Sequence, residues 1–175
     1  MAKLRKMLGS ADHPGIVALM RQMETQSHQT LVHWCTDYML TEILPLYEAR
    51  CDGDARPREA LYAARAWAKG EKSVKETRDT LTAGRVAARE AIDPISQAAA
   101  RAMDSAASSL RTPTSALGCV FYAAAALAYD QAGLQAQSAV YDAIADTVFA
   151  DMLQKLCACS VENEPNPVKI DWGCV

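Results

Sequence analysis

The chain has 175 residues, of which 50% are hydrophobic and 22% are charged. This length and composition predict one globular domain with a buried core and exclude an intrinsically disordered chain. The formal net charge of −3 gives no general attraction to nucleic acid or to an anionic membrane, so neither is expected as a partner.

The N-terminal residues, MAKLRKMLGSADHPG, do not form a secretory signal. They begin with basic residues, but Gly, Ser, Asp, His and Pro stand where a signal peptide has its apolar run. We therefore expect a cytoplasmic protein.

The first third of the chain carries helix signals. Asp12 precedes the amphipathic run HPGIVALMRQME, which predicts a helix with Asp12 as its N-terminal cap. A second helix is expected over residues 29–50 and should bend at Pro45, because proline lacks a backbone donor and clashes with the preceding turn. Asp54 is expected to cap a third helix, and Gly70 to end it in a left-handed conformation.

The middle of the chain is punctuated by further caps. Ser73 and Glu76 have the spacing of a capping box, in which each side chain satisfies a backbone N–H of the first turn. Asp93-Pro94 and Thr112-Pro113 each place a capping side chain before a proline at the first helical position. Helices are therefore expected over residues 94–110 and 113–131, and a last one over 135–157 after Gly133.

The helix expected after Ser73 carries a seam of residues for packing against a neighbouring helix. Its small and apolar residues recur in alternating steps of three and four: Val74, Thr77, Leu81, Gly84, Ala88 and Ala91.

Charge density indicates which helices are buried. Between Asp54 and Asp93, 16 of 40 residues are charged, whereas only four are charged between Pro94 and Gly133. The second window is therefore expected in the middle of the molecule. Its 112–129 stretch contains no charge, but its many alanines leave it less apolar than the ~20 strongly apolar residues that span a bilayer.

These signals predict an all-α fold: an antiparallel multi-helix bundle forming a single domain over residues 1–175. Residues 1–10 form an N-terminal segment. Residues 160–175 form an extended tail, in which Val168, Ile170 and Trp172 alternate with charged residues. Two interpretations of this tail stay open: it lies in a groove of its own bundle, or it reaches a partner.

The chain offers few residues for catalysis or metal binding. His28 and His33 are five residues apart, which is not the spacing of a helical metal-ligand pair, and His13 is the only other histidine. The Cys157-Ala-Cys159 spacing does not match a zinc pair. We expect no metal, no cofactor, no catalytic residue and no enzymatic activity. Reduced thiols are expected at every cysteine: Cys35, Cys51, Cys119, Cys157, Cys159 and Cys174.

Two arginines flank the proline at the start of the third helix, where the helix dipole disfavours cations. The cluster of interest there comprises Asp54, Arg56, Arg58, Arg65 and Trp67. In one interpretation it is structural: Asp54 caps the helix, Arg58 folds back on Asp54, and Arg56 reaches a carboxylate elsewhere in the bundle. In the other, it holds an anion or a partner.

Residues 130–175 carry a net charge of −5. The acidic residues proposed to bind a partner are Asp142, Asp146, Asp151, Glu162 and Glu164. One interpretation is a solvated helix face. The other is a landing surface for a basic partner, since complementary charge speeds association and selects partners.

Four segments resemble the bacterial Imm-5-like immunity proteins: ALMRQMETQSHQTLVHWCTDYMLTEILPLYE, GDARPREALYAARAWAKGE, RTPTSALGCVFYAAAALAYDQAGL and VENEPNPVKIDWGC. The Asp54-Ala-Arg56-Pro-Arg58 helix start and the following AARAW are the most specific part. The resemblance implies a helical cytoplasmic protein without enzymatic activity, which blocks a cognate polymorphic toxin. Relatives carry histidines in the later alanine-rich helices, and this chain has none there, so no role for them is carried over.

Alternatives to that function remain at this point. The chain is also consistent with a small-ligand or metal-carrying helical protein, with a cryptic enzyme, or with a homo-oligomer that exchanges its central helix or tail. Neither the toxin nor its contact surface follows from the sequence. A basic nuclease would suit the acidic C-terminal part.

Overall fold

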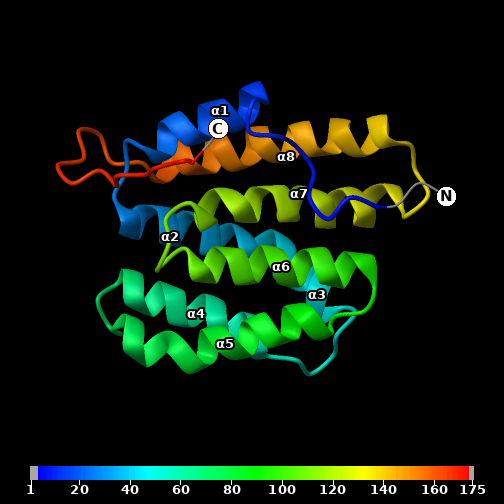
Figure 1. Ribbon diagram of the computed structural model, residues 1–175, viewed down its shortest axis with the longest axis horizontal. Helices are drawn as coiled ribbons and strands as arrows, with labels where there is room; N and C mark the ends of the chain where they lie inside the picture. Colours follow the sequence, from blue (N-terminus) through cyan, green and yellow to red (C-terminus); the bar gives the residue numbers. More distant parts are fainter. Residues whose placement is uncertain (1–3, 174–175) are drawn as a thin grey trace.

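The computed structural model describes residues 4–173. Its helices, in chain order, are α1 (Pro14–Met23), α2 (His28–Tyr38), the π-helical turn η1 (Met39–Ile43), α3 (Leu44–Glu48), α4 (Arg56–Ala68), α5 (Val74–Glu90), α6 (Pro94–Ser108), α7 (Ser115–Ala132) and α8 (Ser138–Cys159). The described part of the chain contains no strand, so the predicted all-α class is confirmed (Figure 1).

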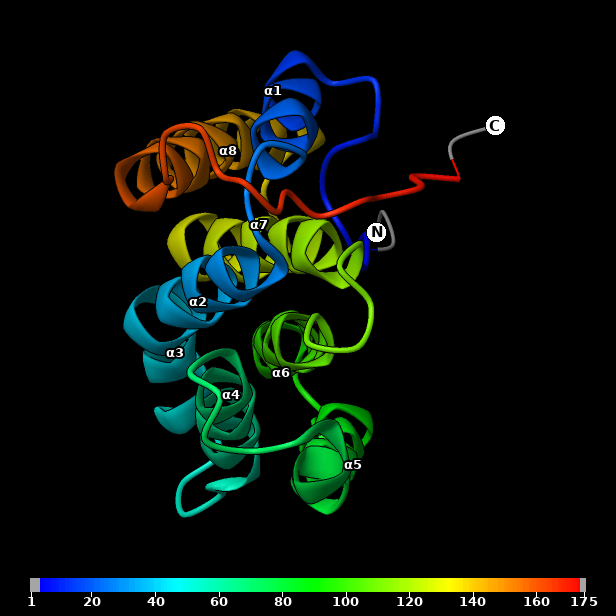
Figure 2. The same cartoon turned by 90° about the vertical axis from the view of Figure 1, so that its left-hand side faces the viewer.

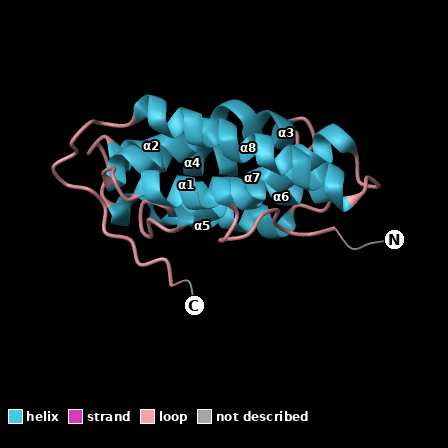
Figure 3. Cartoon of the chain, turned by 90° about the horizontal axis from the view of Figure 1, so that it is seen from above, coloured by secondary structure: helices cyan, strands magenta, loops and turns pink. Residues whose placement is uncertain are grey.

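The helices are stacked in layers and run back and forth along the long axis of the molecule. Figure 2 shows α1 and α8 at one end of the stack and α4 and α5 at the other, with α2, α6 and α7 between them. The view from above shows helices and loops alone in the described residues (Figure 3). The antiparallel bundle predicted from the caps is therefore confirmed.

Several predicted helix ends are confirmed. Ser73 and Glu76 form both hydrogen bonds of the capping box at the start of α5. The Asp93 side chain accepts hydrogen bonds from the backbone N–H groups of the first turn of α6. At the end of α4, Gly70 has a φ of 75°, and the N–H of Glu71 donates to the Ala66 carbonyl at 2.9 Å. This is the pattern of a left-handed glycine stop.

Several helix starts differ from the prediction. The cap of α1 is His13, whose Nδ1 accepts from Gly15 N–H at 3.1 Å, because Asp12 instead accepts from the Ser10 hydroxyl. Thr112 does not cap α7 with its side chain. Its carbonyl accepts from Ser115 N–H in a tight turn, and the helix begins only at Ser115.

The last helix begins at Ser138 rather than at residue 135, because a tyrosine holds the preceding loop in another conformation. The Tyr141 hydroxyl donates to the Gly133 carbonyl at 2.7 Å and accepts from Ala136 N–H at 3.1 Å. These bonds hold residues 133–136 in a loop ahead of α8. At its other end α8 continues to Cys159, two residues beyond the predicted end.

The predicted bend at Pro45 takes the form of a π-helical turn. Pro45 has no N–H to donate, so a regular helix cannot pass through this position without losing a bond. The chain makes a wider turn over Met39–Ile43, in which Leu44 N–H donates to the Met39 carbonyl. The single helix expected over residues 29–50 is therefore divided into α2, η1 and α3.

Alanine-rich helices form the centre of the molecule, as the low charge of residues 94–133 predicted. Ala99, Ala102, Ala106, Ala116, Ala123, Ala124 and Ala125 are all fully buried. Small residues let α6 and α7 approach closely: a Cβ added at Gly118 would lie 2.9 Å from the Ser105 Oγ atom. Of the predicted α5 seam, only Val74 is exposed.

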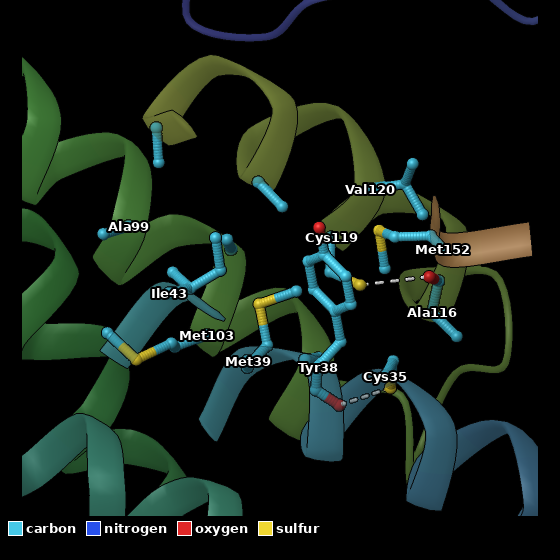
Figure 4. Close-up of a cluster of buried hydrophobic side chains, with 14 of the residues drawn as sticks. Cys35, Tyr38, Met39, Ile43, Ala99, Met103, Ala116, Cys119, Val120 and Met152 are labelled. Atoms are coloured by element: carbon cyan, nitrogen blue, oxygen red, sulfur yellow. Dashed lines mark hydrogen bonds between the residues drawn. The ribbon is translucent and has the colours of Figure 1, made fainter. Parts of the chain in front are cut away.

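Larger side chains fill the remaining core from several helices at once. Figure 4 shows part of this core. Its labelled side chains belong to one buried cluster: Cys35, Tyr38, Met39, Ile43, Ala99, Met103, Ala116, Cys119, Val120 and Met152. They come from α2, η1, α6, α7 and α8, so these elements share a single core.

The cysteines carry free thiols wherever the structure describes them. Cys35 and Cys119 are buried, Cys51 is half-buried, and Cys157 and Cys159 are exposed. Cys174 lies outside the described residues.

The residues that follow α8 return to the end of α1. Gln26 is buried and holds this segment in place: its Oε1 accepts from Val161 N–H at 2.7 Å, and its carbonyl accepts from Val168 N–H at 2.8 Å. The alternating apolar residues Val168, Ile170 and Trp172 pack, half-buried, against the core. Residues 160–173 thus contact their own bundle.

No helix among residues 4–173 combines the length and the apolarity needed to cross a membrane.

Candidate functional site

The predicted acidic residues of α8 are exposed but ion-paired within the chain. Asp142 lies 2.5 Å from Arg5, and Asp146 lies 2.9 Å from His13 Nε2. Asp151 pairs with Lys155, one turn further along α8, at 3.1 Å. The side chains stay 52%, 60% and 43% exposed respectively, so a partner can still reach all of them.

The structure does not bring these acidic residues together on one face. Asp142 and Asp151 are separated by about two and a half helical turns, which places them on opposite sides of α8. Asp142 therefore contacts the N-terminal segment, whereas Asp151 points towards α2 and η1. Glu162 and Glu164 follow the end of α8; Glu162 is exposed, and Glu164 accepts from Asn166 N–H at 3.0 Å.

A cleft of about 500 Å³ lies between α2, η1, α4 and α8; we call it the α2–α8 cleft. Its apolar lining includes Trp34 and Tyr38, and both rings are almost fully buried. Its charged lining comprises Asp37, Glu42, Arg65 and Lys155. An aromatic floor inside a charged rim is typical of surfaces that anchor a protein partner.

The π-helical turn contributes part of this cleft. Thr41 and Glu42 lie in η1, are exposed, and line the cleft. π-helical turns are rare and occur often at functional sites. The position of Pro45 thus determines the shape of the cleft margin, although Pro45 itself is not in the cleft.

The charges at the rim are paired with one another. The Lys155 ammonium lies 3.1 Å from Glu42, 3.1 Å from Asp151 and 4.7 Å above the Tyr38 ring. Burial works against the charge on Lys155, but its hydrogen bonds to Glu42 and Asp151 outweigh burial and raise its pKa. Arg65 closes the opposite side through a 3.1 Å ion pair with Asp37.

The surroundings of the cleft shift the pKa of Tyr38 and of His33. Burial raises the pKa of the Tyr38 hydroxyl, and the negative charges of Asp151 and Glu42 raise it further. Burial lowers the pKa of His33, with Arg65 and Lys69 adding to the effect. Both shifts favour the uncharged form of the side chain, so Tyr38 and His33 can take part in hydrogen bonding and apolar contacts at this site.

The arginines at the start of α4 are neutralised within the chain. Arg56 binds Asp54 in a bidentate manner, with Nε–Oδ1 and Nη2–Oδ2 distances of 2.8 Å, and also lies 2.8 Å from Glu90 on α5. Arg58 does not fold back on Asp54 as predicted. It pairs at 2.5 Å with Glu48 on α3, because Asp54 is already occupied by Arg56 and Tyr47.

The surroundings of Asp54 lower the pKa of its carboxyl group. Hydrogen bonds from Arg56 lower its pKa to about 2, with Tyr47 adding to the effect and burial opposing it. Asp54 also accepts the Arg56 backbone N–H at 3.2 Å, so it satisfies the first turn of α4 even though Ala55 occupies the cap position.

Arg65 and Trp67 belong to a different part of the molecule from Asp54. Arg65 lines the α2–α8 cleft, and the Trp67 ring packs edge-on against His28 at 4.8 Å. The five residues predicted as one cluster therefore form an ion-pair network at one end of α4 and contacts with α2 at the other.

Sequence reasoning did not find the α2–α8 cleft. Of its residues, Arg65 alone was among the predicted site residues, while Tyr38, Glu42 and Lys155 were not. Lys155 lies 113 positions from Glu42 in the chain, and no local spacing signals their meeting. The one available hint was Pro45, which predicted an irregular turn beside the eventual cleft margin.

Residues 4–173 contain no group of three or more His, Cys, Asp or Glu side chains placed to hold a metal ion. A family model described as "Imm-5 like putative immunity protein" matches residues 21–154. This range extends from α1 into α8 and includes the cleft residues of α2, η1 and α4. The cleft residues of α8, Lys155, Ala158 and Cys159, lie just beyond its end. No curated protein and no solved structure was found to match the chain.

Proposed function

The chain belongs to the Imm-5-like immunity protein family, and from this premise we propose that it binds a cognate polymorphic toxin and neutralises it by covering the toxin's functional surface. The observation that carries this proposal is the family match over residues 21–154. Neutralisation by occlusion needs shape and charge complementarity and no reactive group. The protein acts in the cytoplasm of the producing cell, without catalysis.

The contact surface that we propose consists of the α2–α8 cleft and the acidic residues beside it. The cleft offers an aromatic floor in which a partner's side chain is desolvated, and such central anchors supply most of the binding energy in protein interfaces. Asp151 contacts Lys155 at the rim. Asp142 and Asp146 face the N-terminal segment and α1 on the other side of α8. With Glu162 and Glu164 they belong to the proposed acidic surface around α8, and not to the rim of the cleft.

The charge of this region favours a basic toxin. Residues 130–175 carry a net charge of −5, against −3 for the whole chain. A nuclease domain is a basic protein of this kind, because it binds phosphates. We therefore propose a basic nuclease as the toxin.

Filling the cleft tests the contact surface. Thr41 is exposed in η1, and its hydroxyl donates to the Asp37 carbonyl one turn earlier. We expect Thr41→Arg to place a long side chain in the cleft and to abolish binding of the cognate toxin domain. Binding is measured by calorimetry and by survival of cells that express the toxin.

The matched control is Thr82→Arg. Thr82 is also exposed, and its hydroxyl makes the same bond, to the Arg78 carbonyl, but on α5 outside the cleft. Both variants should keep the helical circular-dichroism spectrum, and Thr82→Arg should protect fully. Undiminished binding by Thr41→Arg would remove the cleft from the proposed interface, and failure of the wild-type protein to bind the toxin would refute the function itself.

A further inference from the structure

A second cavity lies on a different part of the surface from the α2–α8 cleft. It has a volume of about 360 Å³ and is lined by residues of α5, α6, the loop between α6 and α7, and α7. Figure 2 shows α5 on the opposite side of the stack from α2 and α3. We call it the arginine pocket, because Arg85, Arg101 and Arg111 all line it.

Two of these arginines have no acidic partner. The ion pairs of the described residues include neither Arg101 nor Arg111, whereas Arg56 and Arg65 on α4 each bind a carboxylate within 3.1 Å. Arg85 is only partly engaged: its Nη2 donates to Ser108 Oγ at 3.3 Å, and its Nε lies 3.6 Å from Asp104. Three arginines thus line one pocket, and the guanidinium groups of Arg101 and Arg111 have no ion pair among the described residues.

Asp104 is the one carboxylate that lines the pocket, and it is poorly compensated. Its Oδ1 atom is inaccessible to solvent and has no hydrogen-bond partner. Burial raises the pKa of Asp104, while Arg85 acts in the opposite direction. With Asp104 fully ionised, three arginines and one aspartate leave the lining with two excess positive charges.

Hydroxyl groups complete the donor-rich lining. Thr112 and Tyr122 each contribute one, while the Ser108 hydroxyl is already engaged by Arg85 and Asp104. The backbone N–H groups at the start of α7 do not contribute, because they already donate to the carbonyls of residues 112–114. Any ligand is therefore held by side chains, chiefly by the arginines.

We propose that the arginine pocket binds the phosphate group of a small phosphorylated molecule. Planar guanidinium groups bind phosphate oxygens in a bidentate manner, and clusters of them are typical of phosphate sites. The cavity is larger than a phosphate ion and falls within the size range of small-molecule pockets. This site is separate from the proposed toxin surface and does not depend on it.

Inorganic phosphate is the probe for the first experiment. We expect phosphate to raise the melting temperature of the wild-type protein in a saturable way, with sodium chloride holding ionic strength constant. The Arg101→Gln/Arg111→Gln double variant should bind phosphate at least tenfold more weakly. The matched control is Arg78→Gln, an exposed arginine on α5 outside the pocket, which should bind phosphate like the wild type.

A second variant tests the pocket without removing an arginine. Asp104→Asn keeps the side-chain shape and removes the one negative charge of the lining, so phosphate should bind several-fold more tightly. An unsaturable response of the wild type, or equal binding by the wild type and the double arginine variant, would overturn the proposal.

A comparison with acetate distinguishes a phosphate site from a carboxylate site. A phosphate site should prefer phosphate to acetate by tenfold or more under the same conditions. Equal or tighter acetate binding that is lost in the double arginine variant would instead identify a pocket for a carboxylate, such as an acidic side chain of a partner, and would overturn the assignment to phosphate.

Discussion

Asp54 illustrates how single residues stabilise an electrostatically unfavourable helix start. It accepts four hydrogen bonds, three from Arg56 and one from the buried Tyr47. Arg56 in turn reaches Glu90, so one aspartate connects α3, α4 and α5. A charge-assisted network of this kind is worth more than an exposed ion pair, because its groups are partly desolvated.

Stability should therefore depend on the ionisation of Asp54. Its pKa of about 2 in the folded protein lies below its ordinary value of 3.8. The stabilisation is present above pH 4 and is lost as the pH falls towards 2, since the unfolded chain takes up the proton first. We expect Asp54→Asn to lower the free energy of unfolding at pH 7 by roughly 1–3 kcal/mol.

The pH profile separates this effect from a general loss of packing. In thermal melts between pH 2 and pH 5, Asp54→Asn should show a flatter dependence than the wild type. Asp52→Asn is the control, because Asp52 is exposed and has no ion pair in the described residues. An identical slope for wild type and Asp54→Asn would show that Asp54 contributes no pH-dependent stability.

At the scale of the elements, helices α4 and α5 pack so closely at Gly84 that no side chain fits between them there. A Cβ added at Gly84 would lie 2.8 Å from the Cβ of Ala60. Ala60 has no flexible end that moves aside, so the two helices would have to separate. The glycine is required by the neighbouring helix and not by its own backbone, which is helical.

This packing predicts the sign of a substitution. In an exposed helix, Gly→Ala stabilises by about 1 kcal/mol. At Gly84 we expect the opposite, a loss of roughly 1–3 kcal/mol from overpacking, measured by urea denaturation. Thr82→Ala on the exposed side of α5 should change stability little, and a stabilised Gly84→Ala variant would mean that α4 and α5 separate at no cost.

Elements whose ends depend on local chemistry were predictable from the sequence. The Ser73 capping box, the Asp93 cap and the Gly70 stop each depend on residues within four positions, and each appears as predicted. The start of α8 was not predictable in this way. It depends on Tyr141, whose hydroxyl binds back to backbone groups of the preceding loop.

The candidate site was less predictable than the fold for the same reason. The ion pairs of Arg58 with Glu48 and of Lys155 with Glu42 join residues from different helices, and their geometry follows from helix packing. The acidic excess of α8 was visible in the sequence. The sequence did not show that Asp142 and Asp146 each have a basic neighbour, because Arg5 and His13 lie far away in the chain.

At the scale of the whole molecule, the acidic charge of α8 should govern how fast a basic toxin associates. Complementary charge mainly raises association rates and is screened by salt. We expect reversal of Asp142, Asp146 and Asp151 to lysine to slow association with the toxin by at least tenfold at low salt and to abolish protection. Stopped-flow measurements at two salt concentrations test this directly.

The control for this variant reverses three exposed acids of the α4–α5 layer, Glu59, Glu71 and Asp79. It changes the net charge by the same amount and should leave association nearly as fast as in the wild type. Because Asp142 and Asp146 also pair with Arg5 and His13, melting temperatures of both variants are compared first. Full protection by the α8 variant would exclude its aspartates from the interface.

The alanine-lined contact between α6 and α7 has a consequence for how such a protein diversifies. Alanine has no side-chain rotamers to restrict on folding, and Gly118 leaves no space for an alternative packing against Ser105. The packing of α6 against α7 therefore does not depend on which residues occupy the surface of the outer helices. Surface substitutions that change which partner is bound are then expected to leave the folding of the scaffold intact.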